Sequence, residues 1–349
     1  MNQIKNILVG VDFSDGACAA LQQALRVATQ NGAALHLLHV IDELALDELA
    51  RVSQSPPAVQ RADALEWGRT ALLRWLEPFA LPENCRTEVA VGTPLDTLLA
   101  RAREGSADLI VVGAQGENAA SPQAGPLAVR VLREAPVKVL LVDSSHARPF
   151  QTMVASVDFT PTCREVVEQA RRLAALGAQR VDFLHVYDPP WHRLTHVLPA
   201  LSANQDLQQQ YVNMLQTRLR DYVGELRGLE ANCVLQEATR HRSGISAYAQ
   251  TRQADLIVVG MRQPGGPRDD RADSTAERLV RELPCSVLAV KPPTAAAVET
   301  QSPIGDVSPS SGAPNDMTCK GMNVFVLDRG GCAVKRRPMG PTGTPANCA

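Results

Sequence analysis

The heptad Ala-Asp-Leu-Ile-Val-Val-Gly occupies residues 107–113 and recurs unchanged at residues 254–260. In both places the apolar residues run without interruption and end on a glycine, which is the pattern of a strand buried on both faces that turns toward a helix. An identity of this length at two distant positions indicates that the chain contains a duplicated domain.

Shorter matches extend the repeat on either side of the heptad and keep the same order along the chain. Residues 11–14 (VDFS) match residues 157–160 (VDFT), residues 38–40 (LHV) match residues 184–186, and residues 133–136 (REAP) match residues 281–284 (RELP). Two copies of about one domain length therefore fill most of the chain. We predict a first domain over residues 1–143, a linker over 144–150, a second domain over 151–291 and a disordered tail over 292–349.

Each copy alternates apolar strand patterns with amphipathic helix patterns. In the first copy we expect strands at residues 7–11, 34–41, 86–91, 109–113 and 137–142, and helices at 15–30, about 62–79, 94–104 and 126–134. In the second copy we expect strands at 153–157, 181–186, 233–237, 256–260 and 286–290, and a long helix at 207–226. Strands that are apolar on both faces and separated by helices must be parallel and covered on both sides. The predicted fold is α/β, with two tandem doubly wound domains, each a five-stranded parallel sheet with helices on both faces.

The segments outside the two copies differ from them in composition. Residues 144–149 are short and polar and end in proline, as expected of a tight linker. From about residue 294 onward no period is sustained and Pro, Ala and Ser are frequent, which predicts disorder, although residues 322–327 have the pattern of a single strand.

Composition and charge exclude several classes of partner. Lys and Arg total 35 against 37 Asp and Glu, so the chain lacks the basic field that drives binding to a phosphate backbone, and we expect no nucleic-acid partner. No apolar run approaches the roughly 20 residues of a membrane helix, so we expect no membrane partner. The N-terminal residues run directly into a strand pattern, which predicts a cytoplasmic protein.

The eight cysteines fit a reducing compartment. Cys18 and Cys163 lie at matching places in the two copies, each on the apolar face of a predicted helix, as small buried side chains would. Cys85 and Cys233 begin matching third strands, and the sequence has no C-x-x-C pair. We therefore predict that these thiols have packing roles, and we predict no metal site.

The matched segments together resemble a universal stress protein. The resemblance rests on Asp12-Phe13-Ser14 after the first strand, on a second strand that ends in His39-Val40, and on the buried strand that ends at Gly113 before a glycine loop. It covers both copies. It implies a nucleotide crevice in each copy between the first and fourth strands, where the strand order reverses.

The family's nucleotide-binding members carry a glycine motif after the fourth strand: Gly, two residues, Gly, nine residues, Gly, then Ser or Thr. Glycines let backbone amides approach phosphate oxygens, and the next helix and the hydroxyl add donors. The first copy reads Gly113, Gly116, then eight residues to Gly125, with Pro126 in place of the hydroxyl. It is one residue short, and proline removes both the hydroxyl and a backbone N–H.

The second copy departs from the motif in the opposite way. It keeps the spacing and the hydroxyls of Ser274 and Thr275, but Gln263 and Asp273 replace two glycines. A carboxylate near an anion site opposes phosphate binding, and the neighbouring Arg and Asp side chains nearly cancel each other. The resemblance implies ATP or AMP as the ligand, and its candidate contact residues are Asp12, Val40, Gly113, Gly116 and Gly125 in the first copy and Asp158, Val186, Gly260, Ser274 and Thr275 in the second.

Each candidate also has a structural interpretation, and the sequence leaves both open. Asp12 and Asp158 have the position of helix caps or Asx-turn residues. Gly113 and Gly260 are required by a strand-to-helix turn whether or not a ligand binds. Ser274 and Thr275 have the position of caps for the last helix.

Three classes of function are compatible with these patterns. We favour a non-enzymatic stress-response protein that acts through protein interaction, with degenerate adenine-nucleotide sites and with the two copies packed on each other as a pseudo-dimer. The alternatives are an ATP- or AMP-binding signalling protein with one functional site, and a weak ATP hydrolase. The sequence names no protein partner, leaves a further homodimer open, and shows no nucleophile paired with a base.

Overall fold

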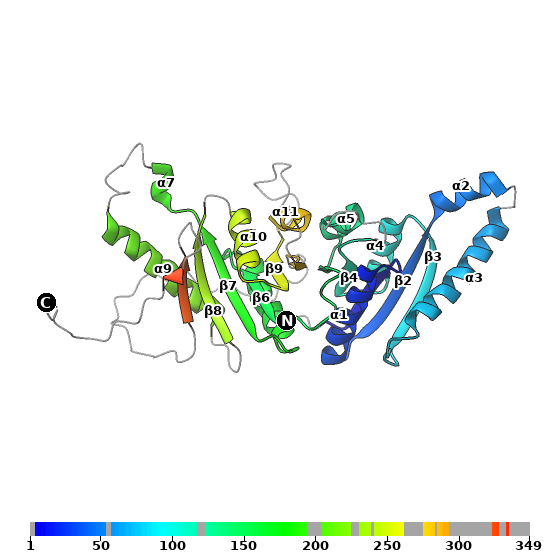
Figure 1. The fold of residues 1–349 in the computed structure, drawn as a ribbon, viewed down its shortest axis with the longest axis horizontal. Coiled ribbons are helices and arrows are strands. Elements are labelled where there is room, and N and C mark those ends of the chain that lie inside the picture. Colours follow the sequence, from blue (N-terminus) through cyan, green and yellow to red (C-terminus); the bar gives the residue numbers. More distant parts are fainter. Residues whose placement is uncertain are drawn as a thin grey trace.

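The computed structural model describes most of the chain, and its strands form a twelve-stranded sheet with helices on both faces (Figure 1). The structure describes residues 4–53, 57–116, 123–194, 204–224, 230–238, 241–261, 275–282, 285–292, 323–327 and 333–334. The α/β class predicted from the sequence is confirmed.

The first domain contributes five strands and five helices among the described residues. The strands are β1 (Asn6–Val11), β2 (Ala34–Asp42), β3 (Cys85–Gly92), β4 (Leu109–Gly113) and β5 (Lys138–Val142). The helices are α1 (Asp15–Asn31), α2 (Glu43–Ser53), α3 (Pro57–Leu76), α4 (Pro94–Glu104) and α5 (Pro126–Glu134).

The second domain repeats this order. Its strands are β6 (Thr152–Ser156), β7 (Arg180–Tyr187), β8 (Glu230–Glu237), β9 (Leu256–Gly260) and β10 (Ser286–Val290). Its described helices are α6 (Thr162–Ala174), α7 (Pro190–Leu194), α9 (Gln205–Val223), α10 (His241–Thr251) and α11 (Thr275–Glu282).

The strand order places the two expected crevices. In the first domain the order is β3-β2-β1-β4-β5 and in the second β8-β7-β6-β9-β10, and all pairs within each domain are parallel. From β1 the chain adds β2 and β3 toward one edge of the sheet, and β4 and β5 then lie on the other side of β1. The strand order therefore reverses between β1 and β4, and in the second domain between β6 and β9. The carboxyl ends of these strands are the places where an open α/β sheet binds ligands.

The two sheets join through their last strands. β5 and β10 pair antiparallel, with Leu140 opposite Leu288 and Leu141 opposite Val287. These four side chains are at most 3% exposed. Two apolar layers, one on each face of the sheet, therefore continue across the seam between the domains. The first layer contains residues of α1, α3, α6 and α9, and the second contains residues of α4, α5, α10 and α11.

Polar contacts fix the linker against both domains. The Gln23 side-chain amide donates to the carbonyls of His146 and Arg148 at 2.7 and 2.6 Å, and the guanidinium of Arg26 donates to the carbonyl of Ala147 at 2.7 Å. On the side of the second domain, the hydroxyl of fully buried Ser286 lies 3.2 Å from the His146 ring. The linker is thus held along its length rather than left as a free tether.

An ion pair also crosses the seam. Lys138 Nζ of β5 lies 3.2 Å from Glu165 Oε1 of α6. The ammonium-bearing side chain is 12% exposed and the carboxylate-bearing one 29%. Partial burial makes such a pair less screened by salt than a surface pair.

In the first domain, the sequence prediction missed one helix and misplaced the start of another. It assigned no element to residues 43–53, where the structure has α2, and it began the next helix at about residue 62, where α3 begins at Pro57. The reason is that Leu44, Leu49 and Val52 in α2 are 57–81% exposed, so α2 lacks a stripe of apolar residues buried in the core.

The match between Cys18 and Cys163 is also corrected. Phe13 and Phe159 both have positive φ, and equal offsets from these residues pair Ala17, not Cys18, with Cys163. Cys163 is buried, and burial raises its pKa to about 12, whereas Cys18 is partly exposed. None of the described cysteines forms a disulfide.

The sheet continues beyond β8 through a segment of the C-terminal region. β11 (Asn323–Leu327) pairs parallel with β8, and β12 (Ala333–Val334) pairs antiparallel with β11. The sequence had left open a single strand at residues 322–327, and β11 occupies nearly that position. The rest of the region predicted to be disordered lies outside the described residues.

None of the helices in the described part of the chain combines the length and apolar character needed to cross a bilayer.

Lys291, the first residue after β10, connects the second domain to the first. Its ammonium donates to the carbonyls of Leu132 and, at 3.3 Å, Arg133 at the end of α5. Burial lowers the pKa of Lys291 to about 8, and Glu277 opposes this shift. A cation at a helix C-terminus satisfies carbonyls that have no partner within the helix.

We predict that Lys291 titrates near pH 8 and that its protonated form is the less favourable one for folding. Because the folded pKa lies below the ordinary 10.5, the folded chain holds this proton less tightly than the unfolded chain between pH 8 and 10.5. The contribution of Lys291 to stability therefore rises with pH across that window and is lowest below it. In a spectrum of ¹³Cε-labelled lysine, one signal should titrate near pH 8 and be absent in Lys291→Met. A midpoint above pH 10 for that signal would contradict the burial argument.

Candidate functional site

The first crevice begins with a tight turn after β1. Asp12 Oδ1 accepts hydrogen bonds from the Ser14 backbone N–H at 3.1 Å and from the Ser14 hydroxyl at 2.5 Å. The Ser14 hydroxyl oxygen in turn accepts the Ala17 N–H at 3.1 Å and caps α1. Asp12 is therefore an Asx-turn residue, and Ser14 is the N-cap of α1. One carboxylate oxygen of Asp12 is thus already hydrogen-bonded within the turn.

The residue between Asp12 and Ser14 has a left-handed backbone. Phe13 has a φ of 65°, which non-glycine residues seldom adopt. The centre of its ring lies 4.4 Å from the centre of the His39 ring. His39 Nδ1 lies 2.8 Å from the carbonyl oxygen of Val11 at the end of β1. The ring contact and this hydrogen bond hold the turn in place, so His39 fixes the shape of the crevice.

Two glycines bring the start of α1 against the end of β4. A Cβ at Gly113 would lie 2.7 Å from the carbonyl carbon of Gly16, and a Cβ at Gly16 would lie 2.6 Å from the carbonyl oxygen of Gln115. Both distances are far below van der Waals contact with backbone atoms that cannot easily move. Gly113 is thus required by packing, as its structural interpretation predicted, and Gly16 is a partner that the sequence analysis did not single out.

The glycine loop lies beside Asp12 and ends at a helix without side-chain donors. A Cβ at Gly116 would lie 3.4 Å from Asp12 Oδ2, so the loop and the turn after β1 border the same space. Gly125 is the N-cap of α5 and makes no side-chain cap, and Pro126 is in the first turn. The N-terminus of α5 therefore offers fewer donors to an anion than a helix that begins with Ser or Thr.

Gln115 within this loop is anchored to the seam. Its amide donates to Asp143 Oδ2 at 2.8 Å, just after β5. Burial alone would raise the pKa of Asp143, but hydrogen bonds from Ser145 and Gln115 outweigh it and hold this pKa below its ordinary value. The loop that would surround a phosphate is thus tied to the junction between the domains.

The second crevice repeats the turn of the first. Asp158 Oδ1 accepts the Thr160 N–H at 3.1 Å and the Thr160 hydroxyl at 2.6 Å, and Phe159 has a φ of 59°. His185 Nδ1 lies 2.7 Å from the carbonyl oxygen of Val157, and its ring lies 4.5 Å from that of Phe159. In this copy Arg218 of α9 also lies over the Phe159 ring, 4.3 Å from its centre.

The two copies differ where the helix meets the fourth strand. Thr162 occupies the place of Gly16, and a Cβ at Gly260 would meet the Thr162 and Val166 methyl groups at 3.4 Å, an ordinary contact. Thr162 is 7% exposed, so the second copy buries a side chain at the position where the first copy has Gly16. Gly260 is therefore not sterically required in the way that Gly113 is.

The remaining candidates are placed differently in the two copies. Val40 is half-buried, whereas Val186 is 3% exposed and its methyl groups lie against Gly244 of α10. Ser274 lies outside the described residues, and Thr275 is the first residue of α11. The first copy thus brings Asp12, Gly113 and Gly116 together, whereas the full motif of the second copy is not described.

A cluster near the second crevice was missed by the sequence analysis. His192 lies 3.1 Å from Asp188 Oδ1 and 3.4 Å from Glu237 Oε1, at the ends of β7 and β8. Next to this cluster Pro190 begins the short helix α7, since proline is tolerated in a first helical turn. Among the described residues no group of three or more His, Cys, Asp or Glu side chains could hold a metal ion.

The fold and these crevices define a class of protein: two doubly wound α/β domains fused in one chain, each with an Asx-turn and a strand-end histidine at its switch point. The profile of the Universal stress protein family matches residues 3–143 and again residues 149–291. The chain therefore belongs to the universal stress protein family, as a tandem member.

Relatives of known sequence and structure are similar to one or both copies. One relative is a Staphylococcus epidermidis protein whose name provisionally places it in the same family. It is 31% identical to this chain over 171 residues, which cover 47% of this chain and 98% of that protein. A universal stress protein from Archaeoglobus fulgidus has a TM-score of 0.55 at 17% identity and covers 83% of this chain and 99% of its own. A protein of unknown function from Pseudomonas aeruginosa has the same TM-score at 21% identity, over 83% of this chain and 93% of its own. These two likenesses concern the fold.

We predict that alanine at the two matched glycines has unequal effects. Gly113→Ala places a methyl group against the Gly16 backbone, and overpacking of this kind costs about 1–3 kcal/mol of unfolding free energy. Gly260→Ala meets only methyl groups at contact distance, so its unfolding free energy should stay within about 1 kcal/mol of the parent. Urea denaturation followed by circular dichroism measures both. Equal losses in the two variants would show that the copies are packed alike.

Proposed function

We propose that this chain is a non-enzymatic stress-response protein that acts through protein interaction and whose two nucleotide crevices are degenerate. The observation that carries the proposal is the state of the first crevice. The hydroxyl of Ser14 and one carboxylate oxygen of Asp12 are occupied by the turn, and α5 begins with Gly125 and Pro126 without a side-chain cap. The part of the cradle that the structure describes thus offers few side-chain donors, and a cradle of this kind stabilises a phosphate chain poorly.

The strand-end histidines support a non-catalytic role. His39 and His185 each place Nδ1 at hydrogen-bond distance from a carbonyl oxygen at the end of the preceding strand, and their rings contact the phenylalanine ring of the turn at a tilt. A histidine so engaged orients the backbone and is poorly placed to move a proton to or from a substrate. The same geometry in both copies is expected of a structural device.

An exposed apolar surface supports the interaction role. α2 and α3 lie at the outer end of the first domain (Figure 1) and present Leu44, Val52, Trp67 and Leu73, which are 60–81% exposed. Large apolar side chains gathered on neighbouring elements are typical of interaction surfaces. The seam between the copies supports the pseudo-dimer part of the proposal, because β5 and β10 cover each other's edges.

The second candidate is an ATP- or AMP-binding protein with one functional crevice, with weak ATP hydrolysis as its enzymatic form. The proximity of Asp12 to the loop at Gly116 favours it, since that space lies at the switch point of the first sheet. A further homodimer and a cytoplasmic location stay predictions from the sequence.

We predict that the purified full-length chain carries no nucleotide. Protein denatured after purification should release no ATP or AMP detectable by mass spectrometry, and ATP with Mg²⁺ should leave its Tm unchanged, because a ligand raises Tm only when it binds the folded state. Near-stoichiometric ATP or AMP would establish the second candidate instead.

We also predict that ATP with Mg²⁺ raises the Tm of the Pro126→Ser variant. Serine restores a hydroxyl and a backbone N–H at the start of α5. Pro94→Ser is the matched control, because Pro94 has the same position at the start of α4, away from the glycine loop. If neither variant responds to ATP, the missing donors are not what limits binding in the first crevice.

A further inference from the structure

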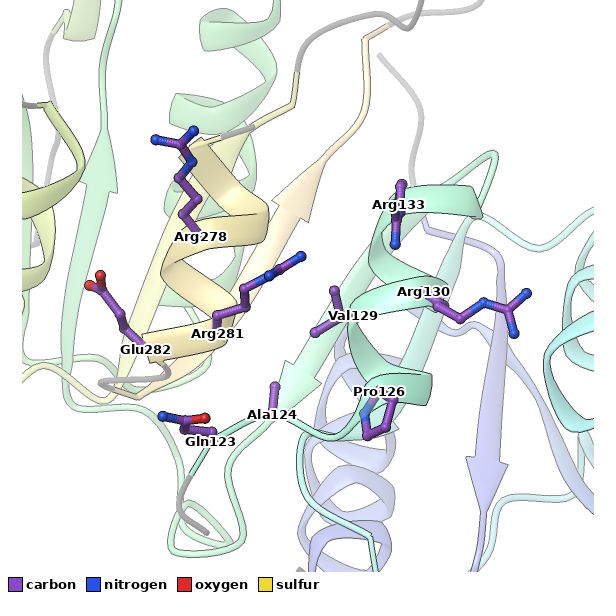
Figure 2. A pocket seen from close by; sticks show the side chains of 9 residues that line it. All are labelled: Gln123, Ala124, Pro126, Val129, Arg130, Arg133, Arg278, Arg281 and Glu282. Atoms are coloured by element: carbon purple, nitrogen blue, oxygen red, sulfur yellow. The ribbon is translucent and has the colours of Figure 1, made fainter. Parts of the chain in front are cut away.

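Each domain has a five-stranded sheet with two edge strands, and a described strand covers all of these edges except β3. β5 and β10 cover each other at the seam, where α5 and α11 lie on either side of a groove of about 640 Å³ (Figure 2). At the outer end of the second domain, β11 pairs with β8. At the outer end of the first domain, no described strand lies beyond β3 (Figure 1).

β3 and β8 have the same place in the two copies. The matched LHV segments of β2 and β7 align Glu88 of β3 with Val234 of β8, because each lies opposite the leucine of its segment. β11 pairs with residues 232–236 of β8. The corresponding part of β3 is therefore residues 86–90.

Every second residue of β3 turns its backbone groups toward the open side. The Leu35 N–H donates to the carbonyl of Asn84 at 3.2 Å, so the even-numbered residues of β3 face β2 and the odd-numbered ones face outward. Val91 agrees with this alternation, because its carbonyl accepts the guanidinium of Arg61 at 3.2 Å. Thr87 and Val89 are left with N–H and C=O groups that face no described strand.

In the second copy the matched backbone groups have a strand beside them. The Ala238 N–H donates to the carbonyl of Tyr187 at 3.0 Å, so the odd-numbered residues of β8 face away from β7. Two of them, Cys233 and Leu235, lie within the ladder with β11 and correspond to Thr87 and Val89 of β3. The fold therefore accepts an added parallel strand at this position.

β3 lacks most of the features that protect an edge strand from pairing. Residues 85–92 contain neither proline nor lysine, and their register with β2 is unbroken by a bulge. The one carboxylate, Glu88, is paired within the domain, with Arg101 at 2.7 Å and with His36 at 2.9 Å. Arg86 reaches the same carboxylate at 2.7 Å. The edge therefore requires no opposite charge, and it offers backbone hydrogen bonds.

We propose that β3 binds an extended segment of a partner protein, which joins the sheet as a parallel strand along residues 86–90. This inference rests on the interaction role proposed above, and it names the site and the form of the partner. In strand addition of this kind the main chain supplies affinity and alternate side chains supply specificity. Because the charges on β3 are already paired, the segment is uncharged and apolar, as Asn-Val-Phe-Val-Leu of β11 is.

The β11 strand of a second copy is not the expected occupant. Within one chain β11 lies beside β8, and a segment tethered in this way has an effective concentration of about the millimolar range. In each copy β11 therefore pairs with its own β8 in preference to β3 of another copy. The partner is a different protein.

A synthetic peptide with the sequence of residues 320–330 is the probe, because it contains the strand that pairs with the matched edge. Fluorescence anisotropy with the full-length chain should show that the peptide binds. Thr87→Pro should weaken binding at least about tenfold, because it removes an outward N–H and leaves the bonds to β2 in place. Thr87→Ala keeps that N–H and is the matched control, with binding within about fivefold of the parent.

A change in the peptide gives a second test that does not depend on the folding of a variant chain. In β11, Val324 and Val326 lie opposite Cys233 and Leu235, so the backbone N–H and C=O of Phe325 between them face β8. The peptide with Phe325→Pro lacks this N–H and should bind at least about tenfold more weakly.

Hydrogen exchange measured by mass spectrometry locates the bound peptide. Slower exchange in residues 85–92 supports the proposal. Slower exchange in residues 230–237 alone would mean that the peptide has replaced β11, and it would overturn the β3 site. Absence of binding to the parent, or equal binding by the parent and Thr87→Pro, would overturn it as well. Circular dichroism of each variant confirms that it is folded.

Light scattering tests the choice of partner. An oligomer that forms with rising protein concentration and is lost in Thr87→Pro would make a second copy the occupant of β3 and overturn the assignment to a different protein. The crevices are tested separately, because ATP or AMP in the purified chain would refute the degenerate-crevice proposal and leave the peptide result unchanged.

Discussion

The pairing of β5 with β10 is the constraint on which the rest of the molecule depends. A five-stranded parallel sheet ends in an edge whose backbone groups need partners, and here each domain supplies the partner of the other. Because the pairing is antiparallel, it also relates the copies by a two-fold axis and sets α5 beside α11. The Lys291 contact and the anchored linker both depend on this one ladder.

The repeat made the architecture predictable from sequence. Continuous apolar runs such as residues 109–113 and 256–260 can only be strands buried on both faces, and their alternation with helix patterns leaves a parallel doubly wound sheet. α2 could not be found in the same way, because its apolar residues face outward. The match of Cys18 with Cys163 was wrong because the aligned segments VDFS and VDFT already place Ala17, and not Cys18, opposite Cys163.

The candidate site was predictable in its positions but not in its chemistry. Sequence placed Asp12 and Gly113 at the first switch point, and the structure brings them to the same crevice. It could not show that Asp12 is hydrogen-bonded within its own turn, or that Gly16 and Gly113 are required by backbone contact. It also could not show that the second copy buries Thr162 at the position of Gly16, since that depends on which helix residue meets the strand end.

The linker held by Gln23 and Arg26 has a consequence for how the two halves can change over time. In a dimer of two identical chains, every substitution occurs in both subunits, and both copies of the domain must remain stable with it. In a fused pair, a glycine can become threonine in one half while the other half keeps its backbone contact, and dilution never separates the two. The covalent link thus allows the two domains to diverge in sequence and role, and they stay associated even when the protein is present at low concentration.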